Sequence, residues 1–132
     1  MTRTGKPTMR ERKPRVDREH QEAVALMQLV RMHEVRWPEL VWFTHIPNGG
    51  ARSKAAAGKL KAEGVRKGAP DYIMPVRSGQ HVGLAIELKA LGGRVESHQR
   101  DWLIHLQNQG WVALACYGAA DAWAAIQRYL KP

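Results

Sequence analysis

This sequence has very little cysteine and no long apolar run. Cys116 is the only cysteine among 132 residues, so neither a disulfide framework nor a Cys-based zinc site can form within one chain. No stretch approaches the roughly 18 apolar residues of a membrane span, and no apolar stretch typical of a secretory signal follows the basic N-terminus. We therefore expect a soluble, cytoplasmic protein in which Cys116 is a buried structural thiol.

Several catalytic sequence patterns are also missing. A P-loop is excluded because Gly58-Lys59 is followed by Leu60, and Ser53 occupies the position of the first glycine. The chain has no Gly-x-Ser-x-Gly elbow, and its six histidines do not have the spacing of a zinc site. Nucleotide binding through a P-loop, serine-hydrolase chemistry and a histidine zinc centre are therefore disfavoured.

Positive charge, in contrast, is in excess. The chain has 21 lysines and arginines against 12 acidic residues, which gives a formal charge of +9. Its length fits one domain, and 44% hydrophobic residues are enough for a substantial core. The charge favours anionic partners, nucleic acid first and acidic membranes second. The alternative is a basic surface without a specific partner.

The first 16 residues differ in composition from the rest. They contain six basic residues against one acidic residue, two prolines and almost no apolar residues. We expect a disordered basic arm at residues 1–16, followed by one folded domain at residues 17–132. The arm would either add non-specific phosphate contacts or serve as a solubilising tail.

Hydrophobic spacing and turn residues predict the order of elements in this domain. We expect helices at residues 17–34, 51–64, 97–109 and 121–130, and strands at residues 40–45, 71–76, 82–89 and 111–117. Ser97 is the expected N-cap of the third helix. The order α-β-α-β-β-α-β-α indicates a single mixed α/β layer structure.

The strands at residues 71–76 and 82–89 form a predicted hairpin. If residues 77–81 are the loop, Val76 pairs with Val82, and Asp71 then stands opposite Glu87. Lys89 follows two residues after Glu87 and shares its face. The intervening leucine and isoleucine residues face the other way and would pack against a helix.

Two carboxylates directly opposite each other repel, so a compensating charge is expected. Oxygen ligands without a fixed cysteine or histidine suggest Mg²⁺ or Mn²⁺. Lys89 could hold an attacking water or stabilise charge that builds on phosphorus. The set Asp71, Glu87 and Lys89 therefore suits phosphodiester hydrolysis, although a Glu-x-Lys strand is also common on solvated faces.

Two further polar residues lie at helix positions that face the core. At about 100° per residue, Glu19 falls on the line of Leu26 and Val30, whereas Glu22 lies to one side of it. A buried acid must be paired or functional, unless it is exposed in the first turn. Gln99 would face the sheet from its helix, where it could bind a water or phosphate, or make a local capping bond.

A basic segment leads into the turn before Asp71. It carries Arg52, Lys54, Lys59, Lys61, Arg66 and Lys67 against Glu63. Such a segment could hold a DNA backbone, although most charge runs are solvated helix faces. His45 precedes the loop that contains Asn48, but a lone histidine is more often structural than catalytic.

Six short segments together resemble the VRR-NUC domain, a branch of the PD-(D/E)xK nuclease superfamily. They are Glu19–Glu22, His45–Arg52, Gly58–Val65, Gly68–Asp71, Ile86–Lys89 and Ser97–Gln99. The resemblance covers about residues 18–131, and the six segments in this order and spacing are highly specific. It implies an α/β fold with a restriction-endonuclease-like PD-(D/E)xK core, in which helices flank a mixed β-sheet.

The resemblance also implies residue roles. Asp71, Glu87 and the backbone carbonyl of Leu88 would bind Mg²⁺, with Mn²⁺ able to substitute, and Lys89 would be the catalytic lysine. Glu19 and Gln99 match the family's helix acid and its glutamine after the Ser-x-Gln turn. Ala23 stands where the family often has glutamine, so Glu22 remains an alternative acid. His45, Asn48 and the basic segment at residues 52–67 would contact DNA.

Stand-alone copies of this domain resemble phage proteins and archaeal-type Holliday junction resolvases. The resemblance therefore implies a homodimer that cuts branched DNA, such as a Holliday junction. The alternatives are a flap, single-strand or nicking nuclease, and a non-catalytic DNA-binding module with the same fold.

Overall fold

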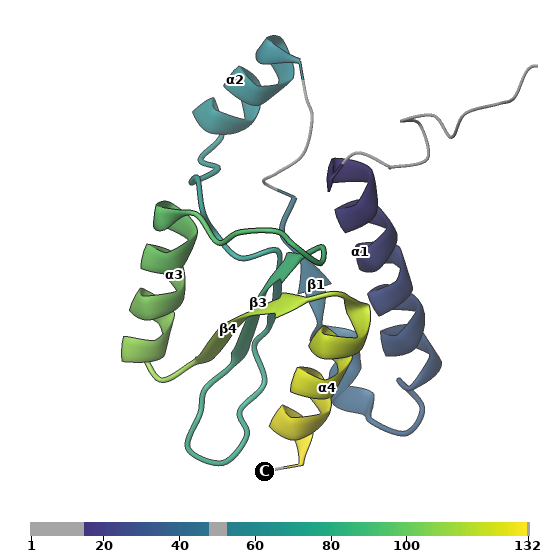
Figure 1. Cartoon of the computed structure of the whole chain (residues 1–132). Helices are drawn as coiled ribbons and strands as arrows, with labels where there is room; N and C mark the ends of the chain where they lie inside the picture. Colours follow the sequence, from purple (N-terminus) through teal and green to yellow (C-terminus); the bar gives the residue numbers. More distant parts are fainter. Residues whose placement is uncertain (1–14, 48–52, 132) are drawn as a thin grey trace, which may run out of the picture.

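The computed structural model describes residues 15–47 and 53–131 as a mixed four-stranded sheet with helices on both faces (Figure 1). This arrangement confirms the predicted α/β class. In chain order the elements are α1 (Arg15–Met32), the 3-10 helix η2 (Pro38–Trp42), β1 (Thr44–His45), α2 (Lys54–Ala62), β2 (Tyr72–Met74), β3 (Leu84–Lys89), α3 (Ser97–Asn108), β4 (Val112–Tyr117) and α4 (Ala119–Leu130).

The sheet has the order β1-β2-β3-β4. β2 is antiparallel to both of its neighbours, whereas β3 and β4 are parallel and are connected through α3. Tyr72 pairs with Ile86 and Met74 with Leu84. One further step in this register places Asp71 opposite Glu87, so the predicted alignment of the two acids is confirmed.

The strands are shorter than predicted. Val76 and Val82 were expected to pair, but they lie outside β2 and β3; the Val76 N–H donates to the Met74 carbonyl and the Val82 N–H to the Gly110 carbonyl. Pro75 explains the early end of β2, because proline has no N–H for the ladder. The predicted strand at residues 40–45 is largely wrong, because Pro38 starts a 3-10 helix and only two residues remain for β1.

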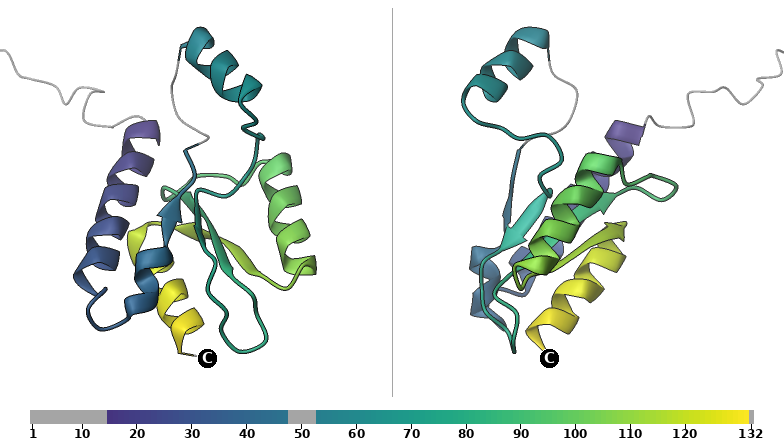
Figure 2. Two further views of the ribbon diagram at one scale, coloured as in Figure 1. Left: turned by 180° about the vertical axis from the view of Figure 1, so that it is seen from behind. Right: turned by 90° about the vertical axis from the view of Figure 1, so that its left-hand side faces the viewer.

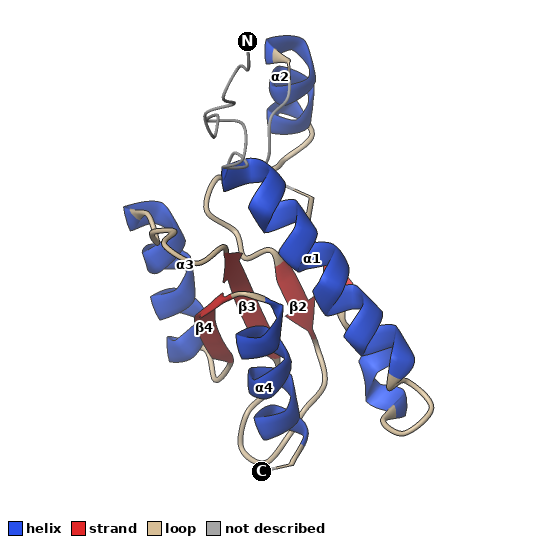
Figure 3. Ribbon diagram, turned by 45° about the vertical axis from the view of Figure 1, so that its right-hand side comes forward, coloured by secondary structure: helices blue, strands red, loops and turns tan. Residues whose placement is uncertain are grey.

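One face of the sheet carries the larger part of the core. Leu84, Ile86 and Leu88 project from β3 into a buried cluster that includes Leu26 of α1 and Ile126 of α4. Figure 3 shows α1 and α4 together on this face. The predicted helix contact of these alternate β3 residues is therefore confirmed, and two helices cover them.

The opposite face of β3 packs on α3. Ala85 forms a second buried cluster with Leu103 of α3 and Ala113 of β4. Because side chains alternate along a strand, Glu87 and Lys89 share the face of Ala85. The small residue leaves room for α3 close to the sheet, and the first turn of α3 therefore lies near the two charged residues.

The first turn of α3 is capped differently from the prediction. The N-cap is Glu96, not Ser97, and Ser97 is the first helical residue. Glu96 and Gln99 form a reciprocal capping box, in which each side chain bonds the backbone N–H of the other residue. A glutamate can replace serine here because its carboxylate reaches the N–H groups of the first turn.

The other predicted helices differ by a few residues at their ends. α1 begins at Arg15 instead of Asp17 and α4 at Ala119 instead of Asp121. The rest of the predicted arm, residues 1–14, lies outside the described residues. In the part of the chain that the structure describes, no helix has the length and apolar character needed to cross a membrane.

α2 stands away from the sheet (Figures 1 and 2) and has no buried residue. Its ends are held by local bonds instead of tertiary packing. The Ser53 hydroxyl accepts the N–H of Ala56 at the start. At the end, Gly64 has a positive φ, and the Val65 N–H reaches back to the Leu60 carbonyl, as in a Schellman motif. The basic side chains of α2 are therefore exposed to solvent.

Cys116 lies in β4 within the larger core cluster, and its side chain is 1% exposed. Burial raises the pKa of this thiol to about 12. The thiol is therefore protonated at neutral pH, which agrees with the predicted structural position and not with a reactive cysteine.

Candidate active site

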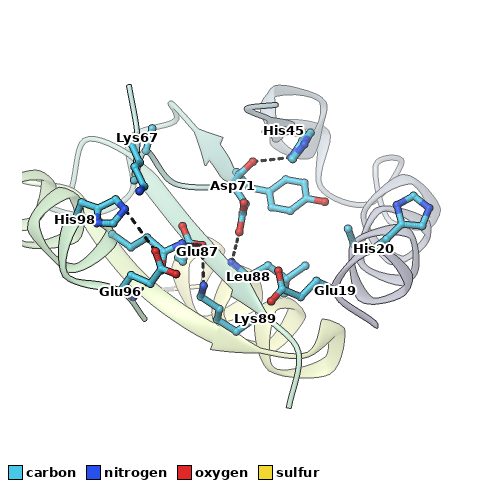
Figure 4. A pocket seen from close by; sticks show the side chains of 15 residues that line it. Glu19, His20, His45, Lys67, Asp71, Glu87, Leu88, Lys89, Glu96 and His98 are labelled. Atoms are coloured by element: carbon cyan, nitrogen blue, oxygen red, sulfur yellow. Dashed lines mark hydrogen bonds and ion pairs between the residues drawn. The ribbon is translucent and has the colours of Figure 1, made fainter. Parts of the chain in front are cut away.

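A pocket of about 410 Å³ opens beside the end of β3, between the first turns of α1 and α3 (Figure 4). It brings together five elements that are far apart in the sequence. The lining residues are Glu19, His20, Ala23, His45, Lys67, Gly68, Ala69, Asp71, Tyr72, Glu87, Leu88, Lys89, Glu96, His98 and Gln99. All five predicted catalytic residues are in this set.

Asp71 is held from both sides just before β2. Its Oδ2 accepts the backbone N–H of Leu88 at 2.7 Å. Its carbonyl accepts the N–H of Ile46 at 2.7 Å and lies 2.9 Å from Nδ1 of His45. The bond from β3 therefore holds the carboxylate, and the bonds from the β1 segment hold the backbone of Asp71.

Glu87 lies in the central strand β3 and is 3% exposed. Its Oε2 accepts a hydrogen bond from Nε2 of Gln99 at 3.0 Å and lies 3.7 Å from Nζ of Lys89. Burial raises the pKa of Glu87 to about 8; the neighbouring Asp71 raises it further and Lys89 lowers it. The carboxyl group is therefore largely protonated at pH 7 when nothing else is bound.

Burial also raises the pKa of Asp71, while its hydrogen bond from the Leu88 N–H acts in the opposite direction. A hydrogen bond between the two carboxyl groups lowers the pKa of Asp71 and raises that of Glu87. Ionisation of both carboxyl groups is therefore unfavourable. A divalent cation bound beside them would offset their negative charge.

Lys89 is unusually buried for a lysine, at 7% exposure. The N–H of Gly118 donates to the Lys89 carbonyl at 2.8 Å, which anchors the end of β3 to the start of α4. The ammonium is directed to the same side as Glu87 (Figure 4). A fixed cation is thereby placed beside the carboxyl pair, as the alternation along the strand predicts.

The two candidate acids of α1 have different surroundings. Glu19 lines the pocket, and its charge contributes to the raised pKa of Glu87. Glu22 is absent from the pocket lining; its Oε1 accepts the N–H of Ala119 at 2.7 Å, at the first turn of α4. The placement favours Glu19 as the site residue and gives Glu22 a capping role, in agreement with the helical angle count.

Gln99 makes the local capping bond that its sequence position suggests, and it also contacts Glu87. Its Oε1 accepts the N–H of Glu96 at 2.8 Å and closes the capping box. Its Nε2 donates to Glu87. One amide therefore fixes the start of α3 and orients the Glu87 carboxyl group at the same time.

The predicted DNA-binding residues divide into three groups. His45 and Lys67 line the pocket, whereas Asn48 and Arg52 lie outside the described residues. The remaining group is exposed on α2 or just after it and does not reach the pocket: Lys54, Lys59, Lys61 and Arg66. This last group is available to a large ligand that extends beyond the pocket.

Sequence reasoning missed several residues of the pocket. Tyr72 is buried, its ring stacks on Phe43 and lies 5.1 Å from that of His45, and burial raises the pKa of its hydroxyl to about 12. Glu96 and His98 lie shortly before Gln99 at the start of α3. Their proximity to Gln99 in the sequence was a usable signal, whereas the ring contact of Tyr72 depends on tertiary packing.

The donor set fits a hard divalent cation. Asp71 and Glu87 supply carboxylate oxygens next to each other, and Leu88 lines the same pocket. Among the described residues, no group of three or more His, Cys, Asp and Glu side chains is arranged as a complete metal site. Mg²⁺ does not need one, because it commonly binds through one or two carboxylates, waters and substrate phosphates.

Comparison with known proteins identifies the family. The model of the VRR-NUC domain matches residues 14–120, so this chain belongs to the VRR-NUC domain family. A solved structure of a VRR-NUC domain protein is 25% identical to it, with a TM-score of 0.72; the match covers 86% of this chain and 88% of that chain. A search of curated proteins gives no significant match. The fold and family are those of a DNA nuclease domain.

Proposed function

We propose that this protein is a metal-dependent DNA endonuclease whose active site is built on Asp71, Glu87 and Lys89. The observation that carries this proposal is the pair of neighbouring acids, the buried Glu87 on β3 and the half-buried Asp71 just before β2, with the Lys89 ammonium 3.7 Å from Glu87. A carboxyl group with a pKa near 8 is costly to ionise unless a positive charge is bound beside it. Perturbed acids gathered in a pocket are typical of catalysis.

The proposed cofactor is Mg²⁺, with Mn²⁺ able to substitute. Asp71 and Glu87 would hold the cation, together with the backbone carbonyl of Leu88. When bound, a divalent cation supplies Lewis-acid polarisation of the scissile phosphate. Its charge would also favour the ionised form of Glu87, so the protein would bind the cation more tightly as the pH rises towards 8.

The protein side chains contribute positioning and charge. The Lys89 ammonium would orient the attacking water or stabilise the negative charge that develops on phosphorus. Gln99 keeps the Glu87 carboxyl in one orientation through its 3.0 Å hydrogen bond. Glu19 approaches the pocket from α1 and would accept a hydrogen bond from a water there.

The proposed substrate is DNA, which would contact residues beyond the pocket as well as those that line it. The exposed basic residues of α2 and the following turn support contacts with the phosphate backbone on one side of the site. By resemblance to stand-alone members of the family, we propose branched DNA of the Holliday-junction type and a homodimer that cuts opposed strands. Flap, single-strand or nicking cleavage is the alternative preference.

The test is cleavage of a labelled four-way junction beside linear duplex and flap DNA, with Mg²⁺, Mn²⁺ or EDTA. We compare the wild type with Glu87→Ala and with Glu39→Ala, an exposed acid on η2 outside the pocket. Metal-dependent cleavage that is lost only in Glu87→Ala supports the proposal, and paired cuts in the junction support the dimer. DNA binding without cleavage under every metal would favour a non-catalytic binding module.

A further inference from the structure

The two sides of the pocket differ in charge. Glu19 approaches from α1 on one side of Glu87, whereas Lys67 and His98 lie together on the other side (Figure 4). Lys67 precedes the turn that leads to Asp71, and His98 belongs to the first turn of α3. The carboxyl pair is therefore bordered on its α3 side by a basic side chain and an imidazole.

The position of Lys67 is fixed by close packing, although its side chain is exposed. The indole N–H of Trp102 donates to the Lys67 carbonyl at 3.2 Å. The next residue, Gly68, has a φ of 93°, and a Cβ at this position would lie 2.6 Å from the backbone oxygen of His98. Only glycine allows the turn to lie so near α3, and this approach places Lys67 beside His98.

The charge of Lys67 is not neutralised within the described part of the chain, where it has no ion pair. Glu96, an acidic group on this side, caps α3, and its Oε1 lies 3.5 Å from Nε2 of His98. An anchored lysine that is open to solvent and adjacent to a carboxyl pair is suited to an anionic group. The partner must also fit the pocket of about 410 Å³ that Lys67 and His98 line.

We propose that Lys67 and His98 bind the DNA phosphate adjacent to the scissile phosphate, and so set which bond lies over Asp71 and Glu87. This inference rests on the proposed nuclease function and deepens it. The two side chains would act as positioning residues, because the phosphate that they hold is not the one that reacts. Lys67 would supply a charge-assisted hydrogen bond and His98 a second donor to the same group.

The test uses a DNA that the wild type cleaves at a mapped bond, in versions with a single uncharged methylphosphonate at each neighbouring position. Single-turnover cleavage is measured for the wild type, Lys67→Ala, His98→Ala and the control Lys131→Ala, which removes an exposed lysine outside the pocket. In the wild type, one modified position next to the cleaved bond should slow cleavage by about tenfold.

In Lys67→Ala, cleavage of unmodified DNA should fall by about the same factor, and that methylphosphonate should have no further effect, because the two changes remove one interaction. In His98→Ala, the methylphosphonate should slow cleavage less than it does in the wild type. In Lys131→Ala, it should slow cleavage as much as in the wild type. Independent, multiplicative effects of Lys67→Ala and every methylphosphonate would overturn the inference while the nuclease function stands. Absence of cleavage by the wild type would overturn both.

Discussion

Replacing Glu87 with glutamine should change how the stability of the protein depends on pH. The neutral form of Glu87 predominates in the folded protein, and glutamine has nearly the same shape. Its side-chain oxygen can still accept the hydrogen bond from Gln99, which Glu87 accepts at 3.0 Å. The variant therefore imitates the protonated carboxyl group but cannot ionise.

The sign and size of this pH dependence follow from the pKa of Glu87. Burial raises the pKa of Glu87 from 4.5 to about 8, so the folded state holds this proton more tightly than the unfolded state. The free energy of unfolding of the wild type should therefore fall as the pH rises from about 4.5 to about 8. The full decrease corresponds to roughly 5 kcal/mol, and the favourable contribution is complete below the unfolded pKa.

The assay is urea unfolding followed by tryptophan fluorescence between pH 5 and pH 9 in EDTA. We expect wild type and Glu87→Gln to have similar stability near pH 5, and the variant to be more stable by several kcal/mol at pH 9. Added Mg²⁺ should stabilise the wild type at pH 9 and leave the variant nearly unchanged. An identical pH dependence of the two proteins would refute the reasoning.

Two further changes test the supports of the site. Gly68→Ala introduces a Cβ 2.6 Å from the His98 oxygen at a φ of 93°, so it should destabilise the protein by on the order of 2–4 kcal/mol in thermal or urea unfolding. Gly64→Ala, also at a positive φ but with no atom within 4 Å of the new Cβ, should destabilise it less. Equal losses of stability in the two variants would contradict the close-packing argument. Glu22→Ala removes the acceptor for the Ala119 N–H and should lower stability by about 1–2 kcal/mol, and Glu22→Gln should lower it less. Glu19→Ala should instead slow DNA cleavage and leave stability nearly unchanged. A loss of cleavage confined to Glu22→Ala would reverse the roles assigned to these two acids.

The central part of the fold could be predicted because its signals are local. Alternation in β3 and the length of the turn between β2 and β3 were enough to align Asp71 with Glu87, and the observed pairing of Tyr72 with Ile86 continues to that alignment. The alignment held even though Val76 and Val82 do not pair, because register depends on the count of residues between the strands and not on the extent of the ladder.

The errors occurred where distant contacts decide the structure. The apolar residues after Pro38 fit a strand as well as a helix, and packing of Leu40 and Phe43 into the core accompanies the 3-10 turn. The cap of α3 is a local exception: Glu96 reaches the N–H of Gln99, whereas a cap by Ser97 is equally reasonable from the sequence. The positions of Lys67 and His98 beside each other require the contact between Gly68 and α3, which no sequence pattern reports.

The most direct test of the proposed active site is strand cleavage by wild type and Lys89→Met at matched DNA occupancy, with Mg²⁺ and with EDTA. Methionine keeps much of the apolar stem of this 7% exposed side chain but removes its charge. We predict Mg²⁺-dependent cleavage by the wild type, and a variant that is folded and binds DNA and Mg²⁺ but cleaves at least a hundredfold more slowly, on the order expected for loss of a charge-stabilising group. Undiminished cleavage by Lys89→Met, or wild-type cleavage that persists in EDTA, would contradict the account.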